Sequence, residues 1–117
     1  MKVLVVDDNL EITSMLTDFL VLSGIDIEVC NDGKEGLAEI LKGDYDKVLL
    51  DLAMPGFSGI DVMDNLKKEN FQNFSKIIIF TASSVTEAEI QKIMAKGVNG
   101  CVRKPVKMPE LLKRLNA

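Results

Sequence analysis

The sequence predicts an α/β fold, a (βα)5 arrangement in which helices cover both faces of a doubly wound, five-stranded parallel sheet. Short apolar runs alternate five times with amphipathic stretches of helical periodicity. Several of these runs are continuously apolar, which is typical of parallel strands buried on both faces. The chain has 117 residues and suits one domain, residues 1–117, because a core of this size can bury about two thirds of the extended surface.

The expected strands are short and rich in apolar residues. They are residues 3–6, 25–29, 48–50, 77–80 and 100–102. The second strand alternates strictly between apolar and charged residues, which predicts one covered and one wet face and therefore a place at an edge of the sheet. The fifth strand is short and is expected at the other edge. These features together predict the strand order 2-1-3-4-5.

Turn and cap residues delimit the expected helices. The turn Asn31-Asp32-Gly33 precedes the second helix, and a loop with Pro and Gly at 54–59 precedes the third. Ser84 and Glu87 have the spacing of a capping box that would open the fourth helix. Pro109 suits the first turn of the last helix.

Composition excludes several classes of function. The chain has no His, so neither a Ser-His-Asp triad nor the usual zinc sites can be built. Its net charge of −4 argues against direct nucleic-acid binding. The apolar runs fall far short of the ~20 residues that span a bilayer, and the first residues do not form a signal peptide. Cys30 and Cys101 have no paired spacing, and we interpret them as reduced packing residues of a cytoplasmic protein.

Polar residues end the buried runs. Asp7 and Asp8 follow the first strand, Asp51 the third, Thr81 the fourth and Lys104 the fifth. In the predicted order, these ends meet near the crevice between strands one and three, where open α/β sheets bind ligands. Three converging carboxylates would raise one another's pKa unless a cation joins them, and Mg²⁺ with oxygen ligands fits. Each residue alone has an ordinary structural explanation, so the hypothesis depends on their combination.

Four stretches carry a resemblance to a known family. They are Val-Leu-Val-Val-Asp-Asp-Asn at 3–9, Val-Leu-Leu-Asp-Leu-Ala-Met-Pro-Gly-Phe-Ser-Gly at 48–59, Phe-Thr-Ala at 80–82 and Arg-Lys-Pro at 103–105. With these stretches in order and at the family's spacing, the chain resembles a response regulator receiver domain of two-component signalling. The resemblance covers essentially the full length, as in a stand-alone receiver, and it implies a flavodoxin-like fold.

The resemblance implies a metal site. Asp8 and Asp51 would hold Mg²⁺ together with the backbone carbonyl of Ala53. Asp7 would act through metal-bound water. These roles agree with the oxygen-only chemistry that Mg²⁺ prefers.

The resemblance also implies a reaction. Asp51 would be the phosphoacceptor, Thr81 and Lys104 would contact the phosphoryl oxygens, and Lys104 would pair with Asp51 beforehand. The chain would be a signalling receiver that catalyses its own phosphorylation and dephosphorylation, and not an enzyme with a separate substrate. Because it has no His, the donor would be a sensor histidine kinase, a histidine phosphotransfer protein of a phosphorelay, or a small acyl phosphate.

The output is expected to be a protein target that docks on the fourth helix, fifth strand and fifth helix. We expect a monomer or a weak, phosphorylation-dependent dimer, with no nucleic acid or membrane as partner. The sequence departs from the family here, because Cys101 and Val106 stand where many members have aromatic residues. By the same resemblance, two small residues, Ala53 and Ser83, would lie near the path of an attacking water. Without the aromatic, the coupling would run through the loop backbone or through repacking of Val102 and Val106.

Other functions stay open on the sequence. The main alternative is a pseudo-receiver, an interaction module that is never phosphorylated, although the intact Asp8, Asp51, Thr81 and Lys104 argue against it. A flavodoxin would have a phosphate loop rich in hydroxyls and Gly after the first strand, where this chain has Asp-Asp-Asn-Leu-Glu. A haloacid-dehalogenase-type phosphatase would place its nucleophilic Asp on the first strand.

Overall fold

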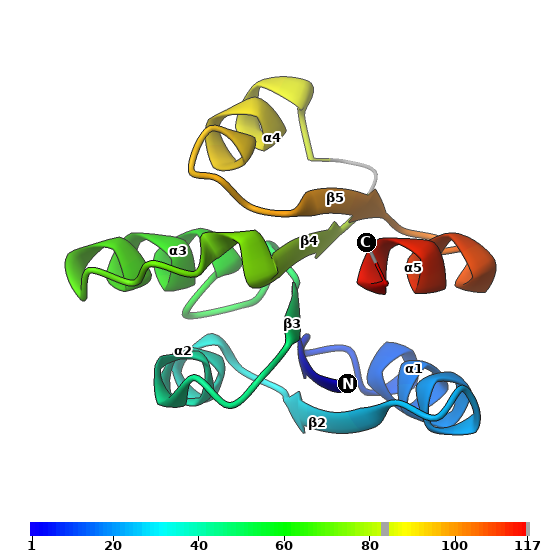
Figure 1. The fold of residues 1–117 in the computed structure, drawn as a ribbon. Coiled ribbons are helices and arrows are strands. Elements are labelled where there is room, and N and C mark those ends of the chain that lie inside the picture. Colours follow the sequence, from blue (N-terminus) through cyan, green and yellow to red (C-terminus); the bar gives the residue numbers. More distant parts are fainter. Residues whose placement is uncertain (83–84, 117) are drawn as a thin grey trace.

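A computed structural model describes residues 1–82 and 85–116 and shows a three-layer α/β/α sandwich (Figure 1). Within those residues, five parallel strands form one sheet in the order β2-β1-β3-β4-β5, which confirms the predicted topology. The strands are β1 (Lys2–Val6), β2 (Asp26–Cys30), β3 (Lys47–Leu50), β4 (Ile77–Thr81) and β5 (Gly100–Arg103). The helices are α1 (Leu10–Leu22), α2 (Gly33–Lys42), α3 (Gly59–Lys68), α4 (Glu87–Met94) and α5 (Met108–Leu115), with a short 3-10 helix, η1 (Phe74–Lys76).

Two helices begin at residues that differ from the prediction. The turn expected at residues 31–33 is the start of α2, because Asp32 caps it by accepting a 2.8 Å hydrogen bond from the Glu35 N–H. The capping box of α4 is formed by Thr86 and Glu89 instead of Ser84 and Glu87. Ser84 lies outside the described residues. Both pairs have the same spacing, so the sequence alone does not distinguish them.

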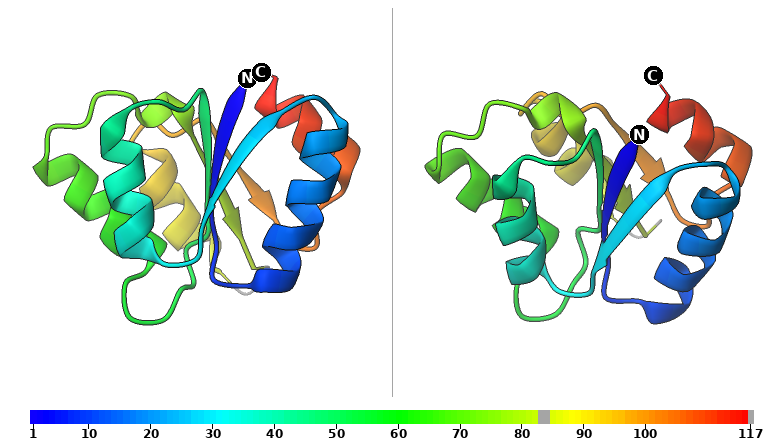
Figure 2. Two further views of the ribbon diagram at one scale, coloured as in Figure 1. Left: turned by 90° about the horizontal axis from the view of Figure 1, so that it is seen from below. Right: turned by 60° about the horizontal axis from the view of Figure 1, so that its bottom comes forward.

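The helices divide between the two faces of the sheet. Figure 1 and Figure 2 show α1 and α5 over one face and α2, α3 and α4 over the other. Successive side chains of a strand point to opposite faces, so Val3 and Val5 pack with the α1 and α5 layer while Leu4 and Val6 pack with the other. The strands β1, β3 and β4 are therefore apolar at nearly every position.

The two edge strands explain the remaining patterns. Ile27 and Val29 of β2 pack under α1 while Asp26 and Glu28 are exposed, as the alternation predicted. Met94 of α4, an apolar residue one position after the buried Ile93, is 37% exposed. No helix among the described residues is long and apolar enough to cross a membrane.

Candidate functional site

The polar residues that end the strands lie together at the carboxyl edge of the sheet. Val6 pairs with Leu50, and Leu50 with Ile79, so the residues that follow β1 and β3 are neighbours. The backbone N–H of Asp51 donates to the carbonyl of Val6 at 2.9 Å, which extends the ladder to the site itself. Parallel register therefore brings Asp7 beside Asp51.

Three carboxylates form a compact acidic cluster. One oxygen from each of Asp7, Asp8 and Asp51 lies within 4.8 Å of the others. Asp7 and Asp51 are buried, and Asp8 is exposed. Asp7 Oδ1 accepts a hydrogen bond from the Asn9 N–H at 2.9 Å, and Asp51 Oδ1 accepts one from the Ala53 N–H at 3.2 Å. These backbone donors orient the two buried carboxylates.

Lys104 brings a positive charge to the buried pair. Its Nζ lies 2.7 Å from Asp7 Oδ2 and 3.6 Å from Asp51 Oδ2. The expected pair with Asp51 is thus present, but the shorter bond goes to Asp7. The backbone N–H of Lys104 donates to the Thr81 carbonyl at 2.7 Å, and its ammonium lies 5.1 Å from the centre of the Phe80 ring. Both contacts hold the side chain over the cluster.

The electrostatics of Asp51 favour binding of a cation. Burial, and then the neighbouring Asp7 carboxylate, raise the pKa of Asp51 above its ordinary range. The Lys104 ammonium and the Ala53 N–H act in the opposite direction without cancelling the rise. A single ammonium does not fully compensate three carboxylates. A hard divalent cation with oxygen ligands fits this cluster.

Thr81 offers a buried donor at the same edge. Its side chain is fully buried, and its Oγ1 has no hydrogen-bond partner among the residues that the structure describes. A buried hydroxyl without a partner costs free energy, so such groups usually have a ligand or another use. The Thr81 hydroxyl can donate to an anion that binds beside Asp51.

The structure brings most of the predicted site residues to one edge of the sheet, and it does not test the predicted metal contact of one backbone carbonyl. The side chains of Asp7, Asp8, Asp51 and Lys104 lie together, and Thr81 ends the neighbouring strand β4 at the same edge of the sheet. The expected metal contact of the Ala53 carbonyl stays a prediction. Ser83, expected near the water path, lies outside the described residues.

Three contacts at the site were not foreseen from the sequence. Gly59 packs on the phosphoacceptor candidate, since a Cβ there would lie 2.2 Å from the Asp51 carbonyl oxygen. The side-chain amide of Asn31 donates to the Asp7 carbonyl at 3.0 Å, and the Phe80 ring faces Lys104. Only Gly59 carried a sequence signal, its place at the end of the Pro/Gly loop.

Comparisons with known proteins match this chain to one family over nearly its whole length. The profile of the response regulator receiver domain family matches residues 3–116. The chain is 33% identical to a transcriptional regulatory protein CpxR homolog of Haemophilus influenzae, over 99% of this chain and 49% of that protein. It is also 33% identical to the transcriptional regulatory protein DltR of Streptococcus agalactiae, over 98% of this chain and 50% of that protein. The chain thus spans about half the length of the curated relatives it matches.

Two solved structures are similar over nearly their full length. The chemotaxis protein CheY4 of Vibrio cholerae is 30% identical, with a TM-score of 0.85 over 98% of this chain and 95% of that chain. The receiver domain of the Francisella response regulator 1452 is 32% identical, with a TM-score of 0.85 over 98% of this chain and 93% of that chain.

Proposed function

This chain belongs to the response regulator receiver domain family of two-component signalling, and we propose on that premise that it is a Mg²⁺-dependent phosphoacceptor switch. Asp51 takes the phosphoryl group, and residues 1–117 form one receiver domain. The observation that carries the proposal is the buried Asp51, which lies beside two further carboxylates and one ammonium. The unpartnered Thr81 hydroxyl at the same edge supports it.

The proposed transfer begins with attack by an Asp51 oxygen on the phosphorus of a donor. With a phosphohistidine donor, the P–N bond breaks and its electron pair leaves with the imidazole nitrogen. The product is an acyl phosphate on Asp51. Hydrolysis reverses the phosphorylation. Water attacks phosphorus and the P–O bond to Asp51 breaks, which returns a carboxylate and inorganic phosphate. The chain thus catalyses its own modification.

The residues around Asp51 stabilise charge on the transferring group. The side chains of Asp8 and Asp51 with the Ala53 carbonyl would hold Mg²⁺, and Asp7 would act on it through metal-bound water. When bound, the ion would supply positive charge that offsets the negative charge of the transferring phosphoryl group. Lys104 Nζ, 3.6 Å from Asp51, and the Thr81 hydroxyl would then bind two of those oxygens.

The proposed partners follow from the chemistry. The donor is a sensor histidine kinase or a histidine phosphotransfer protein, because the chain has no His of its own. The output is a change in the surface formed by α4, β5 and α5, which a protein target reads. The activity of any longer protein that contains this chain depends on that same surface.

The test is phosphorylation by a small donor. We would incubate the protein with acetyl phosphate and Mg²⁺ and measure intact mass, with EDTA in a parallel sample. We expect the mass of one phosphoryl group to be added only with Mg²⁺, and not in Asp51→Asn. Asp26→Asn, at the opposite edge of the sheet, is the matched control and should be modified normally. A folded wild-type protein that gains no mass would instead be a pseudo-receiver.

A further inference from the structure

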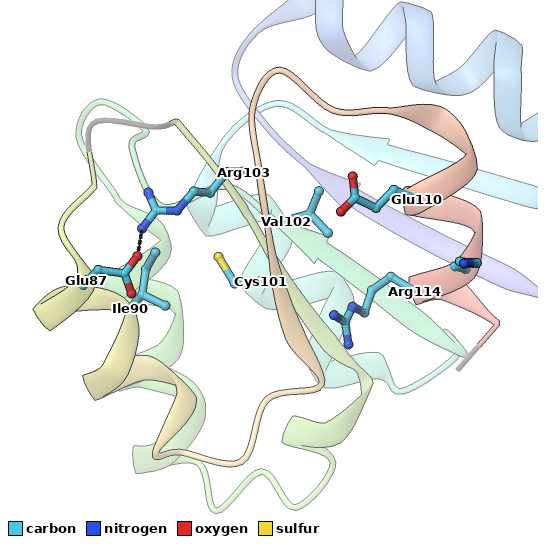
Figure 3. A pocket seen from close by; sticks show the side chains of 8 residues that line it. Glu87, Ile90, Cys101, Val102, Arg103, Glu110 and Arg114 are labelled. Carbon is cyan, nitrogen blue, oxygen red and sulfur yellow. Dashed lines mark hydrogen bonds and ion pairs between the residues drawn. The ribbon is translucent and has the colours of Figure 1, made fainter.

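The face expected to carry the output lacks the usual aromatic ring. Cys101, beside Ile79 in the sheet, stands at the position that many family members give to Tyr or Phe. An open pocket of about 720 Å³ lies between α4, β5 and α5, and Cys101 lines it with Ile90 and Arg114 (Figure 3). A thiol is too small to fill this space by turning inward. Cys101 is therefore a poor candidate to carry a change at Asp51 to α4.

Arg103 connects the site to the start of α4. It is the last residue of β5, precedes Lys104 in the chain and pairs in register with Thr81. Its Nη1 donates to the Val85 carbonyl at 2.9 Å, and its Nη2 donates to Glu87 Oε1 at 2.8 Å. Figure 3 shows the guanidinium extending from β5 to Glu87.

These two acceptors lie on either side of the α4 N-cap. Val85 precedes Thr86 and Glu87 follows it, and Thr86 is the residue whose side chain caps α4. One planar guanidinium with two separate donors thus bonds to the residue before the N-cap of α4 and to the residue after it, and so holds the start of the helix. Lys cannot reproduce this geometry, because it presents a single ammonium.

We propose that Arg103 is the residue that couples Asp51 to α4, and that its two bonds hold the start of α4 in the unphosphorylated position. This inference rests on the proposed phosphoacceptor function. A phosphoryl group on Asp51 attracts the Thr81 hydroxyl and the Lys104 ammonium, the two residues adjacent to Arg103 in register and in sequence. Their movement displaces the Arg103 backbone, so its bonds to Val85 and Glu87 must break or α4 must move with them.

The two bonds contribute unequally. The Glu87 side chain is 78% exposed, and an ion pair so open to solvent is weak and screened by salt. The bond to the Val85 carbonyl is partly buried and has a charged donor, which makes it the stronger of the two. Removal of Glu87 should therefore have a smaller effect than removal of Arg103.

The experiment measures binding of beryllium fluoride, a phosphoryl mimic, with Mg²⁺ by amide chemical shifts of the full chain. If Arg103 stabilises the resting state, Arg103→Ala should bind the mimic roughly three- to tenfold more tightly. Glu87→Gln should gain less than about twofold, and Arg103→Lys should fall between the wild type and Arg103→Ala. Lys113→Ala is the matched control, since it removes a cation of the same pocket that lies on α5 and makes no hydrogen bond or ion pair with α4 among the described residues. It should bind like the wild type.

A second readout does not need the mimic. In Arg103→Ala alone, the amide signals of residues 85–90 should shift along the line that joins the free and mimic-bound wild type. Equal or weaker binding by Arg103→Ala, with thermal unfolding showing a folded protein, would overturn the coupling role while the phosphoacceptor function stands. Failure of the wild type to bind the mimic, or equal binding by Asp51→Asn, would instead refute the proposed function and with it the coupling.

Discussion

The shortest bond of the Lys104 ammonium goes to Asp7, at 2.7 Å, and not to Asp51, which lies 3.6 Å away. Asp7 is fully buried and needs this compensation most. Asp51 consequently keeps much of its negative charge available. A carboxylate that is only loosely paired is the better nucleophile, so this arrangement suits a residue that attacks phosphorus.

The first prediction concerns the free energy of unfolding without divalent ions. Asp51→Asn should raise it by about 1–2 kcal/mol at pH 7, because the substitution removes a buried charge that Asp7 repels. Urea unfolding in EDTA measures this, with Asp26→Asn as the control that should change little. A lower stability for Asp51→Asn than for the wild type would show that Lys104 outweighs the repulsion.

The pH dependence of this gain has a defined sign. Because burial and Asp7 raise the pKa of Asp51 in the folded state, the ionised group destabilises the fold above that pKa. The penalty is absent below the ordinary pKa of the unfolded chain, where Asp51 is protonated in both states. The advantage of Asp51→Asn in EDTA should therefore be largest at neutral pH and shrink as the pH falls through the Asp51 pKa. A difference that grows on acidification would contradict this.

Removal of Lys104 should leave the acidic cluster uncompensated. Lys104→Ala should lower the free energy of unfolding by about 2 kcal/mol in EDTA at pH 7. Mg²⁺ should restore much of the lost stability, since it neutralises the same carboxylates. The variant should therefore bind Mg²⁺ as tightly as the wild type or more tightly. Its amide shifts should no longer respond to beryllium fluoride. Thermal melts with and without Mg²⁺ test the first part, and Lys92→Ala on the exposed side of α4 is the control. An undiminished response in Lys104→Ala would disprove its role.

Replacing Thr81 by Val should change stability in the opposite direction from the same replacement at an ordinary buried Thr, because the Thr81 hydroxyl has no partner among the described residues. Thr81→Val keeps the shape and removes a hydroxyl with no partner among the described residues, so stability should hold or rise by about 1 kcal/mol. Thr13→Val, whose hydroxyl donates to the Leu10 carbonyl at 3.2 Å, should cost about 1 kcal/mol. Only Thr81→Val should weaken the amide shifts at residues 85–88 caused by beryllium fluoride. Equal losses of stability in both variants would mean that Thr81 has a structural partner.

Gly59 positions the backbone of Asp51. Gly59→Ala would place a Cβ 2.2 Å from the Asp51 carbonyl oxygen, so the β3–α3 connection must shift. We expect a loss of about 1–3 kcal/mol and weaker binding of Mg²⁺. Gly97→Ala, strained by a φ of +91° in open space far from the cluster, should cost about 1 kcal/mol without changing Mg²⁺ affinity. Magnesium titrations of the two variants separate the local effect from general destabilisation, and equal affinities would refute the positioning role.

Much of the fold could be predicted from the sequence because its signals are local. Unbroken apolar runs indicate strands that are buried on both faces, and the alternation of residues 25–29 marks an edge strand. Parallel strands end at one edge, so Asp7, Asp51, Thr81 and Lys104 had to gather there once the order was known. The start of α4 was less predictable, since the pairs Ser84–Glu87 and Thr86–Glu89 have equal spacing and only packing chooses between them.

Residue types and their order along the chain were thus enough to predict the strand order, the edge at which the polar residues meet and the chemical character of the cluster. Three features came from the folded arrangement instead: the short bond from Lys104 to Asp7, the Thr81 hydroxyl without a partner among the described residues, and the hydrogen bond from Arg103 to Val85 before α4. Lys104 and Asp7 are 97 positions apart, and Arg103 and Val85 are 18 apart. Contacts of this kind depend on tenths of an ångström in side-chain position, which residue type and spacing along the chain do not encode.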